Sequence, residues 1–177
     1  IVGISSDQIA NLQTADLFAI SSTTLRAMTD AQLGELTSTQ MVSLGGHVSY
    51  LTTSQLAGLS TDDLNSMSAA EFSTLTSSQM AGLSTEQIAN LESTDLRALS
   101  NSALQALSTT QIQAITTDQF EDLRTAQIAA LTTTQFANLT TDQIVALTTD
   151  QAMAIETADI AAITGDQMAA FQGEDVG

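Results

Sequence analysis

An eight-residue repeat runs through almost the whole chain and constrains its fold more than any other feature. The segments LTTTQFAN (131–138) and LTTDQIVA (139–146) show the unit: an aliphatic residue at position 1, Ser or Thr at position 2, Gln at position 5, a large apolar residue at position 6 and a small residue at position 8. Five complete units from Ile4, one of seven residues at 44–50 and fifteen more from Leu51 make 21 units. Because no linker separates them, they predict a single octapeptide-repeat array over 1–177, ending in a terminal tail at 171–177.

The spacing of the apolar positions excludes one continuous helix or strand. Position 6 lies five residues after position 1, and the next position 1 follows three residues later. Both spacings are odd, so a continuous strand would place the two sets on opposite faces. A continuous helix would turn its apolar pair by roughly 80° per unit, because eight residues advance about 800°. A helix must therefore end and restart in every octad.

Positions 2 and 5 supply the restart signal. Position 2 is Ser or Thr in 16 of the 21 units, and position 5 is Gln in 13 units and Asp or Glu in five more. This is the spacing of a capping box, in which the hydroxyl and the position-5 side chain satisfy backbone N–H groups at a helix N-terminus. Where position 2 lacks a hydroxyl, we expect the cap to move to the next residue, as at Thr14, Ser93, Thr125 and Thr157.

These short helices cannot stand alone. A helix of about one and a half turns is unstable in water, so its apolar residues must pack against neighbouring units, and the small residue at position 8 favours close approach of the backbones. We therefore predict an all-α fold, a solenoid of very short capped helices with one per eight-residue repeat. The alternative is a β-solenoid, since Thr and Ile favour strands. Against it, the nine Gly residues are scattered and form no calcium-binding nonapeptide motif.

Two units depart from the pattern. The irregular unit 44–50 is one residue short and carries Gly45-Gly46 in place of the hydroxyl pair, so we expect a kink, a turn without a cap or a contact point there. Ala152 is the one small residue at position 6, and we expect Met153 beside it to fill the gap.

Composition narrows the possible partners. The net charge is −17, with no Lys and no Cys. Such a surface repels phosphate backbones, which argues against nucleic-acid binding. No apolar run approaches the roughly 20 residues of a membrane span, so we expect no membrane insertion. The chain opens at Ile1 without Met, and we expect it to be a processed chain or a piece of a larger polypeptide.

Few residues are candidates for chemistry. His47 and Tyr50, the only His and Tyr, lie together in the irregular unit, and His47 has no second His or Cys with which to bind a metal or to orient a base. The sequence therefore predicts no catalytic, cofactor-binding or metal-binding residue, and no enzyme. Acidic residues recur at position 4, where the helix dipole favours a carboxylate, with calcium binding through converging oxygens as the alternative. They are Asp7, Glu86, Asp118, Asp142, Asp150 and Asp166.

The phrase L-[ST]-T-x-Q-[IL]-A-x-L, which covers Ile4 to Phe171, resembles the octapeptide (LTTDQIAAL-type) repeat arrays of large secreted bacterial surface proteins of the adhesin and RTX-like kind. The resemblance implies an extracellular or cell-surface role, structural or adhesive, with export as part of a larger polypeptide. It carries over no catalytic or binding residue.

Stacked repeats form rods, and neither end of this array shows a strongly polar terminal unit. We therefore expect a structural protein: a rod or self-assembling filament that associates end to end, or the stalk of a bacterial surface protein. The alternative is a binding module for calcium, a glycan or a partner protein, using the variable positions 4 and 7.

A final expectation concerns the number of octads in one coil. Glu92, Arg124 and Glu156 all occupy position 2 and are spaced 32 residues apart. If four octads (or two, counted twice) complete a coil, these side chains line up as a charge ladder along one edge.

Overall fold

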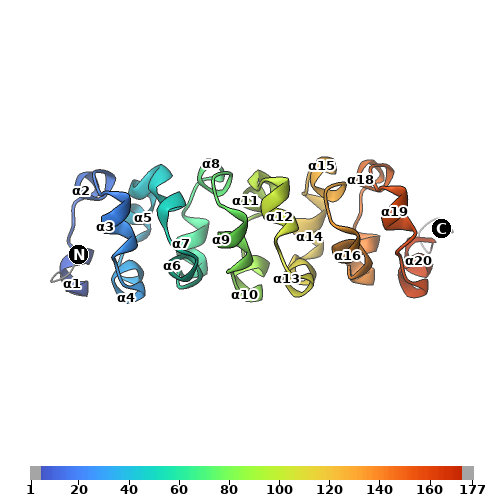
Figure 1. Cartoon of the computed structure of the whole chain (residues 1–177), viewed down its shortest axis with the longest axis horizontal. Helices are drawn as coiled ribbons and strands as arrows, with labels where there is room; N and C mark the ends of the chain where they lie inside the picture. The colour runs from blue at the N-terminus through green and yellow to red at the C-terminus, as the bar shows by residue number, and fades with distance from the viewer. Residues whose placement is uncertain (1–4, 173–177) are drawn as a thin grey trace.

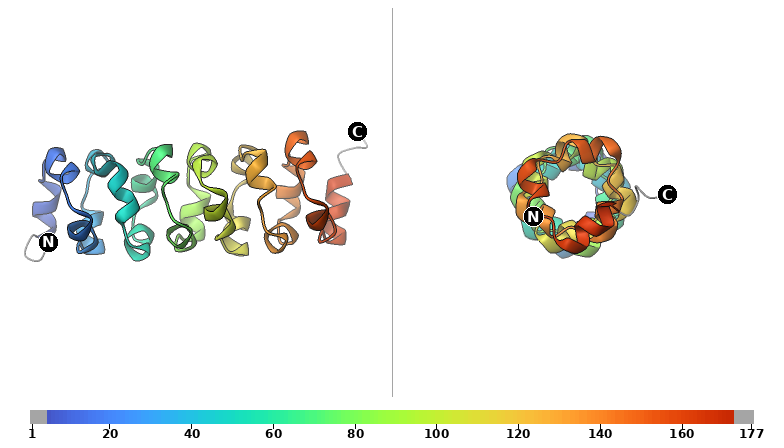
Figure 2. Two further views of the ribbon diagram at one scale, coloured as in Figure 1. Left: turned by 45° about the horizontal axis from the view of Figure 1, so that its top comes forward. Right: turned by 90° about the vertical axis from the view of Figure 1, so that its right-hand side faces the viewer.

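The computed structural model, which describes residues 5–172, is a rod of short helices wound around one long axis (Figure 1). Seen end-on, the helices form a ring about that axis (Figure 2). No strand occurs within residues 5–172, so the β-solenoid alternative is wrong and the all-α solenoid is confirmed.

Twenty α-helices and one 3-10 helix (η1) form the described part of the chain, one for each repeat unit. Their bounds are α1 Ser6–Ala10, α2 Thr14–Phe18, α3 Ser22–Arg26, α4 Asp30–Gly34, α5 Ser38–Leu44, η1 Gly45–Tyr50, α6 Thr53–Ala57, α7 Thr61–Asn65, α8 Ala69–Phe72, α9 Ser77–Ala81, α10 Thr85–Ala89, α11 Ser93–Ala98, α12 Asn101–Gln105, α13 Thr109–Ala114, α14 Thr117–Glu121, α15 Thr125–Ile128, α16 Thr133–Ala137, α17 Thr141–Val145, α18 Thr149–Met153, α19 Thr157–Ile160 and α20 Gly165–Gln172.

The predicted capping box starts most of these helices. In α13, Ser108 is extended (φ −65°, ψ 162°), and its Oγ accepts a hydrogen bond from the backbone N–H of Gln111 at 3.2 Å. The Ser108 N–H in turn donates to Oε1 of Gln111 at 2.8 Å. Each reciprocal pair satisfies two backbone donors that the helix itself leaves unpaired.

The prediction that the cap moves by one residue is wrong. Where position 2 lacks a hydroxyl, that residue is still the N-cap, and its side chain accepts no capping hydrogen bond: Gln13, Glu92, Arg124 and Glu156. Packing of positions 1 and 6 fixes where each helix begins, because burying these side chains stabilises the fold more than a single capping hydrogen bond does. The hydroxyl at position 3 therefore falls inside the first turn.

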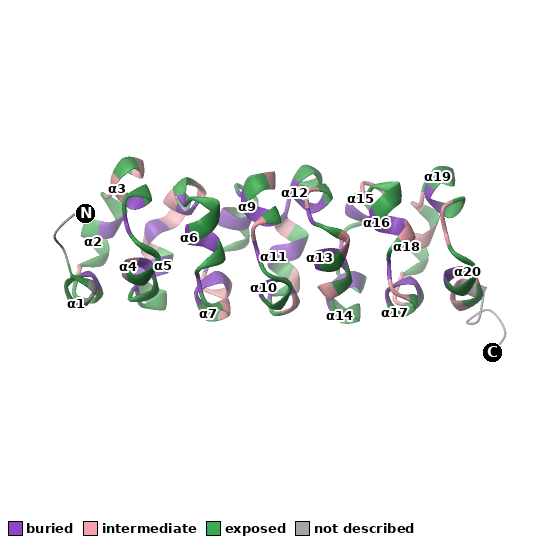
Figure 3. Ribbon diagram, turned by 60° about the horizontal axis from the view of Figure 1, so that its bottom comes forward, coloured by how far each residue is buried: buried purple, intermediate pink, exposed green. Residues whose placement is uncertain are grey.

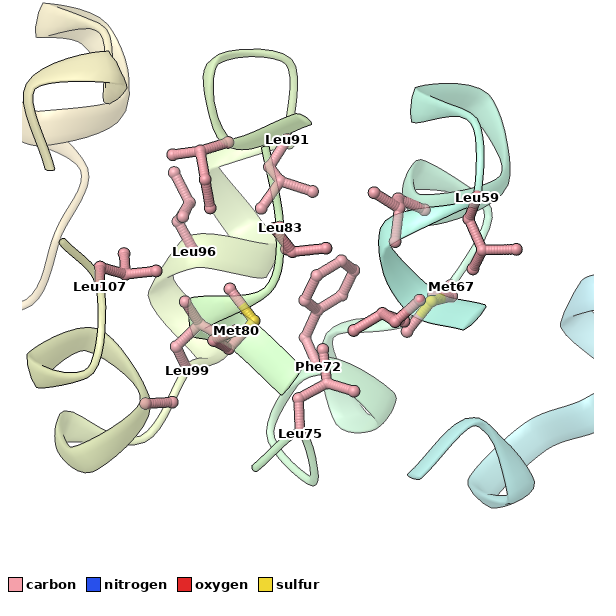
Figure 4. Close-up of a cluster of buried hydrophobic side chains, with 14 of the residues drawn as sticks. Leu59, Met67, Phe72, Leu75, Met80, Leu83, Leu91, Leu96, Leu99 and Leu107 are labelled. Atoms are coloured by element: carbon pink, nitrogen blue, oxygen red, sulfur yellow. The ribbon is translucent and has the colours of Figure 1, made fainter. Parts of the chain in front are cut away.

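Positions 1 and 6 form one core that runs along the rod. Their side chains make a continuous buried cluster from Ile9 to Ile144, and exposed residues cover the outside of the helices (Figure 3). Position 6 is the more enclosed, since Phe72 and Met80 are fully buried, and Figure 4 shows them among leucines of several units. Each such side chain contributes roughly 1.5–3 kcal/mol. This burial stabilises helices that are too short to form alone.

One turn of the coil takes about three and a half octads. Helices pack on the helix three units later, as α8 does on α11 and α9 on α12. Gln143 donates to the carbonyl of Ile115, 28 residues earlier. The predicted four-octad coil is therefore wrong: an eight-residue period does not determine how many units close a turn, because the bend at positions 1 and 2 sets that number. Small residues at position 8 do allow close approach, since a Cβ at Gly82 would collide with Cγ2 of Thr53 one turn away.

The irregular unit is a turn without a cap, one of the three forms that the sequence predicted. No side chain caps η1, and Gly45 has φ 52°, a region that favours glycine. The coil continues through it (Figure 1). Gln55 reaches the carbonyls of Leu25 and Met28, which lie 30 and 27 residues back. Those spans are 31 and 28 in the regular turns, so the deletion shortens one turn by one residue.

The gap at Ala152 in the C-terminal units stays open. Met153 is 74% exposed, so the prediction that it fills the space beside Ala152 is wrong. Position 7 points away from the core, and a cavity of about 420 Å³ remains beside Ala152, lined also by Leu147 and Phe171. The predicted terminal tail at 171–177 starts inside helix α20, which continues to Gln172, and its remaining residues 173–177 lie outside the described residues.

Candidate functional site

The rod is held together by a row of buried glutamines, which we call the glutamine ladder. At position 5 of a unit, each of these side chains donates through Nε2 to backbone carbonyls of the preceding turn. The ladder consists of Gln40, Gln55, Gln79, Gln87, Gln111, Gln119, Gln127, Gln135, Gln143, Gln151 and Gln167.

Gln111 shows how one side chain serves two helices. Its Oε1 accepts from the N-cap N–H of its own helix, α13. Its Nε2 donates to the carbonyls of Leu83 at 2.6 Å and Ala81 at 3.2 Å, where α9 ends one turn earlier. A helix leaves its last carbonyls and its first N–H groups unpaired, and Gln111, 5% exposed, satisfies groups of both kinds.

Acidic residues replace Gln in four buried ladder positions: Asp63, Glu71, Asp95 and Asp159. A carboxylate can accept the cap N–H but has no N–H to donate to the preceding turn. One oxygen each of Glu71 and Asp95 is buried without a hydrogen-bond partner. Burial, and secondarily the negative charge of Glu92, raises the pKa of Asp95 from 3.8 to about 6.

A second row of hydrogen bonds links adjacent turns at the surface. Asn65 donates to the carbonyl of Asn90 at 2.8 Å and Gln113 to that of Asn138 at 2.7 Å, in both cases 25 residues away. These exposed bonds accompany the buried ladder and fix the same register between turns.

Arg124 belongs to this surface row. Its Nη2 donates to the Leu99 carbonyl at 2.9 Å, which also accepts from Gln127. Within residues 5–172, no carboxylate forms an ion pair with it inside 4.0 Å. The predicted charge ladder with Glu92 and Glu156 rested on a four-octad coil and fails with it.

At both ends of the described rod, groups of the ladder lack hydrogen-bond partners among the described residues: an amide donor at one end and carbonyl acceptors at the other. At the N-terminal end, Oε1 of Gln8 accepts from Ser5, while no described residue accepts from its Nε2. At the C-terminal end, no side chain of the described residues donates to the carbonyls of Leu147, Ile155 or Ile163, which occupy position 1 of the last units. One end therefore presents a donor and the other presents acceptors.

His47 packs between two rings. Its centroid lies 5.6 Å from that of Tyr50 and 6.1 Å from that of Phe18, and its Nδ1 is buried without a partner. Arg26 donates to the backbone carbonyl of Tyr50 at 2.9 Å, which anchors this unit to the preceding turn. The arrangement holds three aromatic rings together beside η1.

The position-4 acids lie in the first turns of their helices, exposed to solvent. Throughout the part of the chain that the structure describes, no three His, Cys, Asp or Glu residues gather in a way that could hold a metal ion. None of the described helices is long and apolar enough to cross a membrane.

Comparison with known families agrees with this architecture. The family model described as the ALTTAQ repeat matches residues 9–45, 56–93, 88–125 and 120–149. None of the curated proteins compared with the chain matches it. The matched segments cover well over half of the sequence and follow the octads whose capping boxes and ladder glutamines build the rod. The chain belongs to the ALTTAQ repeat family.

Proposed function

We propose that this protein is a structural element, a rod that forms the stalk of a surface protein or a unit of a filament. The glutamine ladder carries the proposal, because it repeats along the rod and, among residues 5–172, leaves an amide donor at one end and carbonyl acceptors at the other. Most octads present a position-5 amide to carbonyls of the preceding turn, so the contact that joins turns within the chain can also lengthen the rod.

Extension uses the contact already present inside the rod. If a second copy stacks its first turn on the last turn of this one, Gln8 meets carbonyls such as that of Ile155. The half-buried apolar side chains of Ile163 and Phe171 become covered at the same time. Such a head-to-tail contact does not close on itself and generates a fibre. Within a longer polypeptide, the same contact joins further octads.

We place the rod outside the cell or at the cell surface and assign it no catalytic activity. The resemblance to octapeptide arrays of secreted bacterial surface proteins and the absence of Cys support this location. The charge of −17 supports a role that involves no nucleic acid.

Sedimentation and electron microscopy test the filament form. We expect the mass of the assemblies to rise with protein concentration and filaments to be visible. Replacing Gln8→Glu removes the free amide donor and places a charge against carbonyls, so it should shift assembly to higher concentration. Thr85→Glu, which adds the same charge at an exposed position in the middle of the rod, should leave assembly unchanged.

Small-angle scattering tests the stalk form. Duplicating residues 83–114, four complete octads, should lengthen the particle along one axis and leave its cross-section unchanged. A particle that grows in all directions would contradict the rod, and monodisperse short rods at high concentration would exclude self-assembly.

A further inference from the structure

A cavity of about 470 Å³ opens beside the irregular unit. One wall comes from Val42, Gly45 and Gly46, and the other comes from the next turn, through Ser66, Ser68, Ala70, Glu71 and Thr74. The space exists because the unit is one residue short and two of its residues have no side chain. A Cβ at either Gly would meet no atom within 4 Å.

Glu71, which lines this cavity, has one carboxylate oxygen that is buried and unpaired. The side chain is 7% exposed, and its Oε2 accepts from the N–H of Ser68 at 2.7 Å and from its hydroxyl at 2.8 Å. Oε2 thus accepts the N-cap hydrogen bond that Oε1 of a ladder glutamine accepts in other units. Oε1 of Glu71 corresponds to the amide nitrogen of those glutamines, and it has no partner. A buried carboxylate oxygen without a donor is costly.

A cation that carries hydrogen-bond donors would supply the missing partner and balance the charge. The chain has no Lys, and within residues 5–172 no guanidinium pairs with Glu71. Calcium needs six to eight oxygen ligands. Because Glu71 is the one acidic residue that lines this cavity, the cavity suits calcium poorly. A primary ammonium has three donors, which suit Oε1 together with hydroxyls of the wall. The side chains of Val42 and Ala70 would contact an apolar body attached to that ammonium.

We propose that this cavity binds a small organic molecule with a primary ammonium group, and that Glu71 is its counter-ion. The cavity size suits a small ligand. The last torsion of a carboxylate side chain is soft, so Oε1 can turn toward the opening when an ammonium enters. The site lies on the side of the rod, away from both ends, so the proposal does not depend on the structural role above.

The first test titrates the ¹⁵N-labelled chain with n-butylammonium chloride and follows amide chemical shifts. We expect saturable changes confined to residues 42–46 and 66–74. n-Butanol, which lacks the charge, and tetraethylammonium chloride, which lacks N–H donors, should give much weaker changes at equal concentration. No saturable change with n-butylammonium, or equal changes with all three compounds, would overturn the proposal.

The second test removes the charge without altering the shape. Glu71→Gln is isosteric and introduces the residue that most other octads carry there, so folding should be preserved. We expect n-butylammonium to bind at least about tenfold more weakly, because a charge-assisted hydrogen bond is lost. Glu121→Gln, an exposed position outside the cavity, should bind as the parent does. Undiminished binding to Glu71→Gln would remove Glu71 from the site.

Discussion

The amide nitrogen of Gln143 lies 2.8 Å from the carbonyl oxygen of Ile115, 28 residues earlier in the chain and one turn away in the coil. The same nitrogen lies 2.8 Å from the carbonyl of Ile112, while the Oε1 of the same side chain accepts from Thr140. This side chain is 2% exposed. Turn-to-turn packing in the rod therefore depends on a hydrogen-bond donor at position 5, and the helix cap depends on an acceptor there.

Replacing Gln143→Glu should destabilise the fold. The change keeps the acceptor for Thr140 but removes the donor and faces a buried negative charge toward two carbonyl oxygens. We expect a loss of about 2–4 kcal/mol in the free energy of unfolding at pH 7, measured by urea denaturation. At acid pH the protonated carboxyl can donate, so the loss should shrink. Gln13→Glu at an exposed N-cap is the control, and an equal loss there would refute the ladder.

The helical part of this architecture follows from local sequence. Apolar spacing and capping boxes act within one octad, so they predict a helix in each unit without knowledge of the coil. The preference for Gln at position 5, with a single Glu, was also a signal. Either residue completes a capping box, and only the amide has an N–H to donate to another turn.

The remaining features depend on how many residues make one turn of the coil, and the eight-residue period does not determine that number. The cavity beside Glu71 joins residues 42–46 to residues 66–74, which meet only because the coil closes after about three and a half octads. The predicted charge ladder through Arg124 was wrong for the same reason, because it assumed four octads per turn. The prediction for Met153 was wrong for a different reason. Met153 is the last residue of a very short helix, and packing decides whether such a residue points inward.

Asp95 should make the rod more stable in acid than at neutral pH. Burial raises its pKa from 3.8 to about 6, so the folded state holds this proton more tightly than the unfolded state. Its contribution is complete below pH 3.8 and is lost as the pH rises through 6. Asp95→Asn should therefore exceed the parent in stability by on the order of 2 kcal/mol at pH 7.

The measurement for Asp95 is the difference in melting temperature between Asp95→Asn and the parent at pH 4 and pH 7. The difference should be small at the lower pH and positive at the higher one. Asp118→Asn at an exposed position 4 provides the control. A constant difference across this range would contradict the assignment of the titration to Asp95.

Filling the gap at position 6 should stabilise the C-terminal units. Ala152→Leu places a side chain into the cavity of about 420 Å³ beside Leu147 and Phe171. Burial of three additional carbon atoms should add about 1–2 kcal/mol to the free energy of unfolding, visible as a higher melting temperature. Ala158→Leu, which is exposed, should give no gain. A lower melting temperature for Ala152→Leu would show that the surrounding helices are too close for the larger side chain.

Restoring the eighth residue of the irregular unit should regularise the ladder there. Replacing Gly45-Gly46-His47 by Thr-Thr-Asp-Gln supplies a capping hydroxyl and a position-5 glutamine, which would face the carbonyls of Leu17 and Ile20 in the preceding turn. Each new hydrogen bond contributes about 0.5–1.5 kcal/mol and the cap about 1 kcal/mol, against the loss of the ring contacts of His47. The melting temperature should rise.

Since side chains would also occupy the space beside Glu71, the same variant should lose n-butylammonium binding. A lower melting temperature would mean that the short unit is required by the packing of its neighbours.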